Sequence, residues 1–273
     1  METFLSFFEN MAAWQKLVWL SSVLILFWIL EGFYSLVKFK YNKWEHARTN
    51  LILLGFVLLI NLGFGILTAG VFIWLNNSNF GLLHFIELPI WAELVVSLMV
   101  LDLIAQYFVH FLLHKIRWMW RLHIIHHSEI HVDVTTGTRH HPFDYLIREI
   151  FALIAVIIMG MPLAFYLFYR ILSVFFTYFS HANLSLPKKL DKALSYVFVT
   201  PNMHKFHHHY ELPWTDSNYG NILSIWDRIF GTMVYEDTRN IRYGIDIVDD
   251  STSQDLGFQL KIPFNRSIKT TRN

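Results

Sequence analysis

Four long blocks of apolar residues dominate the pattern of hydrophobic and polar positions along the chain. They occupy residues 17–37, 51–75, 91–114 and 150–180. A helix needs about 20 consecutive apolar residues to cross a hydrocarbon core roughly 30 Å thick, and each block is long enough. The pattern therefore predicts an all-α integral membrane protein with about four transmembrane segments.

The fourth block contains a break near its middle. The sequence Gly-Met-Pro stands at residues 160–162, where a turn is expected. The block is also too short for two full crossings of about 20 residues each. We therefore expect a re-entrant or shallow helical hairpin, which keeps the segments before and after it on the same side of the membrane.

Basic residues between the blocks indicate the orientation of the chain. Residues 38–50 contain four basic residues against a single acidic one, whereas the next connection, residues 76–89, contains neither Lys nor Arg. The positive-inside rule makes the first connection cytoplasmic and the N-terminus external. Lys115, Arg117 and Arg121 directly after the third block agree with this orientation. The residues from His181 onward are expected to form a polar cytosolic cap.

The chain shows no internal repeat, so we expect a single membrane domain over residues 1–273. Within it we expect an N-terminal transmembrane hairpin region at residues 1–90, a catalytic region at residues 91–235 and a polar C-terminal tail at residues 236–273. The N-terminus lacks a cationic stretch followed by a small-residue cleavage site, which favours a retained first span over a signal peptide.

Composition supports a membrane protein and excludes several kinds of site. Hydrophobic residues make up 54% of the chain and charged residues 16%, and the mean hydropathy is +0.37. The formal net charge is +1 without a dense basic run, so nucleic acid is not an expected partner. The chain has no cysteine, which excludes disulfides, thiolate zinc sites and iron–sulfur clusters. Any bound metal must therefore be held by nitrogen or oxygen.

Histidine is concentrated in a few short stretches. Residues three and four apart share a face of a helix, so the histidines form three helical faces. These faces are His110 with His114, then His123 with His126 and His127, then His204 with His207 and His208. The nine residues from His114 to His123 turn a straight helix by about half a revolution. The chain must therefore bend within "KIRWMW" if the first two faces are to converge.

The third apolar block carries a polar stripe, in which Asp102, Gln106, His110 and His114 follow one another at intervals of four. Polar side chains in a spanning helix are costly unless they face a protein interior or a site, so the stripe marks the buried face. His110 lies roughly 29 Å along the helix from Trp91, near the cytoplasmic boundary of the hydrocarbon. A metal site there is open to lipid and to soluble partners.

Each histidine motif alone has an ordinary structural explanation, such as hydrogen-bonded or interfacial side chains. The convergence of nine or ten histidines favours a metal centre, because two six-coordinate ions offer about twelve positions while one zinc needs three or four. No Glu-x-x-His or His-Glu-x-x-His sequence occurs, which argues against a soluble di-iron helix pair and a zinc protease. Four histidines lack a suitable same-face partner and are expected at the surface or in supporting positions: His46, His84, His131 and His209.

The order and spacing of these motifs resemble the membrane-bound fatty acid hydroxylase and sterol desaturase superfamily. Its His-x-x-x-His motif and its two His-x-x-His-His motifs match the three histidine faces. Two longer segments, "LHIIHHSEIHVDVTTGTRHHPFD" and "DSNYGNILSIWDRIFGT", look like those of the bacterial-type sterol desaturase branch. The resemblance covers roughly residues 95–235. Phe111 and Asp144 depart from residues common in the family, and we expect neither to touch a ligand.

The resemblance implies a non-haem di-iron oxygenase that hydroxylates or desaturates a lipid. It implies two iron ions, O2 as co-substrate, and a separate electron donor of the ferredoxin or cytochrome type. It places the site on the cytoplasmic side of a multi-pass protein of the bacterial inner membrane. The ligands it implies are His110, His114, His123, His126, His127, His181, His204, His207 and His208, with His141 as a weaker tenth. The supporting polar candidates are Asp102, Gln106, Asn183, Asp216 and Asn218.

Several alternatives stay open at this point. A membrane bis-histidine haem protein needs only two axial histidines per haem, and a divalent-metal transporter or metal-binding protein needs polar residues across several spans. Asp216 and Asn218 equally suit a turn and helix cap. The sequence does not distinguish a sterol, fatty acyl chain, carotenoid, sphingolipid or alkylglycerol as substrate.

Overall fold

The computed structural model describes residues 1–239, 241–249 and 251–269, and within these ranges the regular elements are all helical. The α-helices are α1 (Glu2–Glu9), α2 (Ala13–Phe33), α3 (Lys43–Ser78), α4 (Ile90–Asp102), α5 (Val109–Lys115), α6 (Arg117–His127), α7 (Pro142–Met159), α8 (Leu163–His181), α9 (Lys188–Leu194), α10 (Pro201–His207), α11 (Ile225–Ile229) and α12 (Leu256–Lys261). Short 3₁₀ helices are η1 (Leu82–Phe85), η3 (Val134–Thr138) and η4 (Trp214–Asp216), and η2 (Leu103–Phe108) is a π-helical turn between α4 and α5. The all-α prediction is confirmed.

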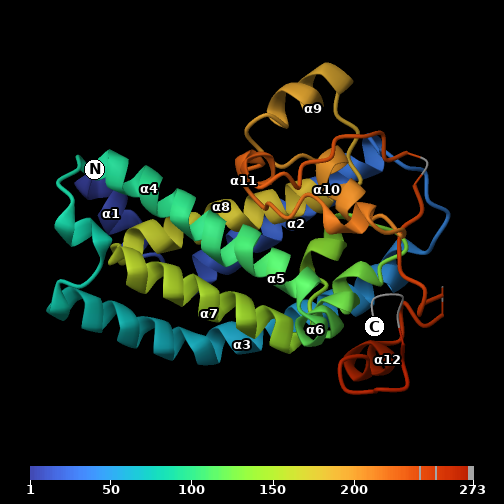
Figure 1. Ribbon diagram of the computed structural model, residues 1–273, viewed down its shortest axis with the longest axis horizontal. Coiled ribbons are helices and arrows are strands. Elements are labelled where there is room, and N and C mark those ends of the chain that lie inside the picture. Colours follow the sequence, from blue (N-terminus) through green and yellow to red (C-terminus); the bar gives the residue numbers. More distant parts are fainter. Residues whose placement is uncertain (240, 250, 270–273) are drawn as a thin grey trace.

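The long helices lie side by side along the long axis of the molecule, and the short helices α6, α10 and α12 gather towards one end (Figure 1). Helix α8 packs against α1, α2, α4 and α10, while α3 packs against α7. The largest apolar core lies between α4, α7 and α8, with Phe165 and Leu101 fully buried in it. This bundle therefore holds the short helices as a cap at one end.

Four helical segments are long and apolar enough to cross a membrane: Ala13–Phe33, Lys43–Phe85, Ile90–Lys115 and Leu163–His181. The first three overlap the first three expected blocks, and the fourth, which is α8, covers only the second half of the block at residues 150–180. Their length and composition, with many apolar side chains on the outside of the bundle, make the chain a multi-pass membrane protein.

The expected turn at residues 160–162 is confirmed, because α7 ends at Met159 and α8 begins at Leu163. The expected length of this hairpin was wrong. Helix α7 begins at Pro142, eight residues before the apolar block, with Pro142 in its first turn and the ring of His141 accepting a hydrogen bond from the Phe143 amide. Charged residues in the first turns of α7 hide this start from a hydropathy pattern. How the hairpin lies in a bilayer stays a prediction.

The expected bend between the first two histidine faces is confirmed. Helix α5 ends at Lys115, Ile116 is extended with φ −97° and ψ 116°, and α6 begins at Arg117. One extended residue is enough to turn α6 back against α5, and the two helices pack on each other. Their histidines can therefore face a common interior.

The turn between α7 and α8 is held by a close approach of two glycines. Gly160 has φ +66° and Gly81, in the connection after α3, has φ +119°. A Cβ on Gly160 would overlap the carbonyl oxygen of Phe80, and a Cβ on Gly81 would overlap the backbone of Gly160. Glycine is therefore required at both positions by backbone conformation and by space.

We expect Gly160→Ala to lower the free energy of unfolding by about 1–3 kcal/mol or more, because the alanine is strained at positive φ and meets the Phe80 carbonyl. Thermal unfolding of the purified protein in detergent, followed by circular dichroism, measures the change. Gly63→Ala is the matched control, since a Cβ there meets nothing within 4 Å and lies inside helix α3. An equal Tm for the two variants would contradict the required glycine contact.

Candidate metal centre

Nine histidines from four helices converge in the cap. One cluster contains His110, His114, His123, His127 and His207, and the other contains His126, His181, His204 and His208. Within each cluster, one ring nitrogen from every histidine lies within 4.8 Å of the others. All nine side chains are buried. The structure thus brings together every histidine of the three helical faces, together with His181 at the end of α8.

Local sequence features place these rings. The bend at Ile116 brings His123 and His127 of α6 to the two histidines of α5. Helix α10 begins at Pro201, and the Thr200 hydroxyl accepts a 3.4 Å hydrogen bond from the Met203 amide. This start fixes the rotation of α10, so that His207 points to the first cluster, whereas His204 and His208 point to the second.

The rings are anchored through their Nδ1 atoms to oxygen acceptors. Backbone carbonyl oxygens accept from His110 (Tyr219, 2.9 Å), His126 (Arg139, 3.2 Å), His181 (Thr177, 2.7 Å) and His207 (Ser217, 2.6 Å), and carboxylates pair with His123 (Asp144, 2.9 Å) and His114 (Asp216, 3.2 Å). A carbonyl oxygen can only accept, so Nδ1 carries the hydrogen in those rings. Their Nε2 atoms therefore present lone pairs to the interior of the centre.

Several of these lone pairs face one another. The Nε2 atoms of His110 and His123 lie 3.0 Å apart, and those of His126 and His181 lie 3.2 Å apart. Both members of each pair have already given their Nδ1 hydrogen to an oxygen. Two facing lone pairs repel unless a cation lies between them. The arrangement is therefore suited to binding positive ions.

Burial keeps the imidazoles neutral. It lowers the pKa of His123 to about 4, even though Asp144 beside it favours the charged form. Burial likewise holds the pKa values of His126, His204 and His208 well below the ordinary value of 6.5. The neutral ring is the form that binds a metal.

Asp144 lies in direct contact with the centre, so the expectation that it touches no ligand was wrong. Its Oδ2 is 2.9 Å from Nδ1 of His123 and 3.2 Å from Nδ1 of His140, and its Oδ1 accepts from Arg148. Asp144 is fully buried at the start of α7. The early start of α7, which the hydropathy pattern missed, is what brings this carboxylate to His123.

His141 lies outside both clusters, and His140 lies beside them. The Nδ1 of His141 accepts from the Phe143 amide at 3.1 Å and so caps α7. The His140 ring stacks on His126, with centroids 4.8 Å apart and planes inclined by 9°. Sequence reasoning missed His140, although Pro142 gave a signal. A proline in the first turn predicts that the residue before it caps the helix, which leaves His140 as the residue that can reach the centre.

Among the polar candidates, Asp216 is the one that contacts a clustered histidine, His114, and its other oxygen accepts from Lys115 at 2.7 Å. Asp102 accepts from the Trp226 indole and from two backbone amides at residues 222 and 223, and so anchors the segment before α11. The π-helical turn η2 separates it from the histidines. One extra residue in a turn rotates the rest of the helix by about 100°.

The remaining polar candidates hold backbone in place. Asn183 exchanges hydrogen bonds with both backbone groups of Val37. Asn218 has φ 54° and donates to the carbonyls of Met203 and Val234, which ties its turn to α10. Gln106 lies 3.4 Å from the Ser173 hydroxyl and lines a cavity beside the centre.

Two fully buried cations that sequence reasoning missed hold the cap together. Arg139 donates to the Ile125 carbonyl at 2.8 Å, to the Asn50 side chain at 2.8 Å and to the Ser128 hydroxyl. Lys205 donates to the carbonyls of Val132 and His181, at 2.7 and 3.0 Å. Each cation links histidine-bearing segments through backbone oxygens. Nothing in a one-dimensional pattern distinguishes them from solvated basic residues.

The remaining histidines stay away from the nine. His46 and His131 lie near Glu129 in a separate group, where Nε2 of His46 is 3.4 Å from that carboxylate. His84 is exposed in η1, and the ring of His209 accepts from the Glu211 amide. His46 is buried, so a surface position is excluded for it.

Comparison with known proteins identifies the family of this chain. The family model described as fatty acid hydroxylase matches residues 94–232. The chain belongs to the fatty acid hydroxylase family. The expected resemblance is thus confirmed, and the segment that matches the fatty acid hydroxylase model contains all nine clustered histidines.

Three curated relatives show how similar the chain is to proteins with named activities. The chain is 30% identical over 144 residues to the ornithine lipid hydroxylase of Rhizobium tropici, which covers 53% of the chain. It is 31% identical over 183 residues to the alkylglycerol monooxygenase of Danio rerio, which covers 66% of the chain. It is 27% identical over 226 residues to a very-long-chain aldehyde decarbonylase of Oryza sativa subsp. indica, covering 76% of the chain and 84% of that protein.

The match spans 42% of the ornithine lipid hydroxylase and 38% of the alkylglycerol monooxygenase. The chain therefore corresponds to less than half of the length of these two relatives. No solved structure gives a significant match.

We expect the stability of the metal-free protein to fall as the pH drops from 6.5 towards 4. In that window the unfolded chain binds protons on histidines that stay neutral in the folded chain, so protons favour unfolding. Each such histidine contributes up to about 1.4 kcal/mol per pH unit. Thermal unfolding of chelator-treated protein over a pH series measures the slope.

The exposed His84 supplies the control, because the His84→Ala variant should give the same pH profile as the unchanged chain. A Tm that stays constant between pH 7 and pH 5 would contradict neutral burial of the clustered rings.

Proposed function

We propose that the protein is a membrane-bound non-haem di-iron oxygenase that hydroxylates or desaturates a C–H bond of a lipid, using O2 and electrons from a separate donor protein. The observation that carries this proposal is the set of anchored imidazoles whose Nε2 lone pairs face one another at 3.0 and 3.2 Å.

The donor set fits iron. The five and four ring nitrogens of the two clusters suit two ions, and nine nitrogens leave about three of roughly twelve six-coordinate positions for oxygen or water. A single zinc would use only three or four of them. Both ring nitrogens of the buried His208 have no hydrogen-bond partner among the described residues, so this ring can offer either nitrogen to an ion.

Bound iron would supply one-electron redox steps and the activation of dioxygen. The protein's own residues orient and enclose the site. Where Nδ1 donates to a carbonyl or to Asp144, the hydrogen bond holds the ring at one rotation, which keeps its Nε2 directed inward. Burial of the nine rings keeps bulk water away from the reacting atoms.

A lipid substrate is supported by position and by relatives. The site lies where the candidate spans Ile90–Lys115 and Leu163–His181 end, so an acyl chain or ring system can reach it from the bilayer. Two relatives are named for hydroxylation of an ornithine lipid and monooxygenation of an alkylglycerol. We infer from the positive-inside pattern that the centre faces the cytoplasm of a bacterial inner membrane. A ferredoxin or cytochrome can deliver electrons there.

We expect purified protein to contain about two iron ions per chain. His127→Ala in the first cluster and His204→Ala in the second should each lower the iron content to about one or fewer, because a ligand nitrogen is lost. Elemental analysis measures the metal. In cells grown with oxygen, lipid mass spectrometry should show a lipid altered by one oxygen or two hydrogens that disappears in both variants.

His84→Ala should keep the iron and the altered lipid, since His84 lies outside both clusters. One tightly bound zinc without iron, or lipids identical with and without the gene, would overturn the proposal.

We expect Asp144→Asn to lower iron affinity by about 10- to 100-fold while leaving the fold intact, because an amide holds the His123 and His140 rings less firmly than a carboxylate does. Titration of the metal-free protein with ferrous iron measures the affinity. Asp255→Asn, at the exposed start of α12, is the matched control. Equal affinities in the two variants would show that Asp144 does not support the centre.

A further inference from the structure

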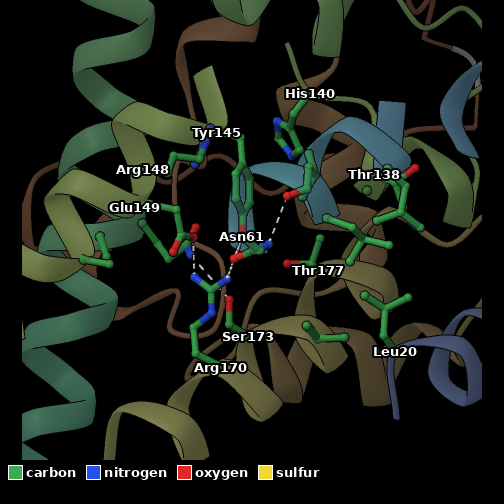
Figure 2. Close-up of a pocket in the computed structure, with 18 of the residues that line it drawn as sticks. Leu20, Asn61, Thr138, His140, Tyr145, Arg148, Glu149, Arg170, Ser173 and Thr177 are labelled. Carbon is green, nitrogen blue, oxygen red and sulfur yellow. Dashed lines mark hydrogen bonds and ion pairs between the residues drawn. The ribbon is translucent and has the colours of Figure 1, made fainter. Parts of the chain in front are cut away.

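A cavity of about 160 Å³ lies beside the histidine centre, between α3, α7 and α8. Each of these helices lines it with residues from one face: Leu54, Val57, Leu58 and Asn61 of α3, Tyr145, Arg148, Glu149 and Ala152 of α7, and Arg170, Ser173, Val174 and Thr177 of α8. In Figure 2, His140 and Thr138 lie on one side of it and Arg170 on the opposite side. The cavity therefore runs from the histidine cap into the bundle.

The cavity is lined by residues that contact the clustered histidines. His140, which lines it, stacks on His126 of the second cluster. Thr177, which also lines it, accepts a hydrogen bond from Nδ1 of His181 through its carbonyl oxygen. A molecule in the cavity can therefore lie next to the second cluster.

The side of the cavity opposite His140 is called the far wall here. It carries a polar network in an otherwise apolar part of the bundle (Figure 2). Arg170 is paired with Glu149 at 2.5 Å and donates to the Tyr145 hydroxyl at 2.6 Å. The Asn61 side chain lies 2.7 Å from the same hydroxyl. Asn61 and Arg170 belong to candidate membrane spans, so these polar groups lie inside the hydrophobic part of the protein. Ionisable residues there are costly and commonly mark a binding site.

The charges on this wall cancel. Arg170 is balanced by Glu149, and Arg148 is balanced by Asp144. A carboxylate or phosphate group would meet Glu149 as well as Arg170, so the wall does not favour an anion. The Tyr145 hydroxyl and the Asn61 amide donate to each other's side chains, so their hydrogens hold the wall together. Arg170 donates to Glu149, Asn61 and Tyr145, and a guanidinium has five N–H groups. The wall therefore favours an uncharged oxygen that accepts a hydrogen bond from Arg170.

Size and position restrict the ligand further. A cavity of about 150 Å³ can hold a benzene-sized molecule, so this one admits a ring or a short stretch of chain but not a large headgroup. Arg170 and Thr177 both line the cavity and are seven residues apart, roughly 10 Å along α8. The oxygen held at the far wall and the carbon beside the histidines therefore belong to different parts of one lipid.

We propose that this cavity binds the lipid substrate and that Arg170, held in position by Tyr145 and Asn61, recognises an uncharged oxygen group of it, such as a hydroxyl or ether. This inference rests on the proposed function, because it names the substrate class of the same centre. It selects lipids with a neutral oxygen over plain hydrocarbons and over free acids.

The test uses the purified, iron-free full chain in lipid nanodiscs and a photoreactive hexadecanol with a diazirine in its chain. Mass spectrometry of the irradiated protein should find the label on peptides of α3, α7 and α8. Unlabelled hexadecanol should displace the probe at least about 10-fold better than hexadecane or palmitate. Equal displacement by hexadecane, better displacement by palmitate, or no label in these helices would overturn the inference.

Two variants distinguish recognition of the lipid oxygen from a purely structural role, in which the polar network only joins α7 to α8. Tyr145→Phe removes the hydroxyl that holds the Arg170 guanidinium and should weaken displacement by hexadecanol about 2- to 10-fold, the effect of one neutral hydrogen bond. Glu149→Gln leaves Arg170 without its counter-charge, and so should shift the preference about 10-fold from hexadecanol towards palmitate. Unchanged preferences in both folded variants would mean that the network only joins α7 to α8.

Tyr166→Phe is the matched control, since Tyr166 contacts Glu149 at 3.5 Å but does not line the cavity. Its displacement curve should match that of the unchanged chain. Iron content is measured on the protein as purified, before the iron is removed for the displacement experiment. A chain that binds no iron but prefers hexadecanol would refute the proposed function alone, and an iron-containing chain without this preference would refute the inference alone.

Discussion

The hydrogen bonds between histidine Nδ1 atoms and oxygen acceptors are the constraint on which the centre depends. Several acceptors come from other segments of the chain, because His110 donates to the carbonyl of Tyr219 and His126 to that of Arg139. These rings are therefore oriented only when another segment has folded against them, whereas His181 donates to Thr177 within α8. Burial removes water as an alternative partner and keeps the rings neutral. Folding of the cap and assembly of the ligand set are thus one event.

Two buried cations also hold the histidine-bearing segments together. Arg139 and Lys205 place their charges among backbone carbonyls of the histidine-bearing segments, and both are fully buried. A buried cation without such partners would be strongly destabilising. The carbonyl at His181 accepts from Lys205, so the end of α8 is held to α10 as well as to the second cluster. The cap is consequently stabilised by polar contacts, whereas the bundle below it is stabilised mainly by apolar packing.

Much of this arrangement could be predicted from the sequence, because helical periodicity is a local property. The spacing of the histidines predicted three faces, and the angle between the first two predicted the bend that Ile116 makes. The long-range features could not be predicted in this way. The start of α7 was hidden by charged residues that are buried in the fold, and with it the contact of Asp144 with His123. His140 replaced His141 beside the centre because helix capping uses the latter ring.

Helix α10 has seven residues and carries His207 of one cluster and His204 of the other, and His208 of the second cluster follows directly after its last residue. Neighbouring positions on so short a helix cannot shift independently. The spacing between the two histidine clusters is therefore set by the pitch of one helical turn and not by the packing of separate domains. Any displacement of this helix, for example by a docking protein, would alter both halves of the centre in the same motion.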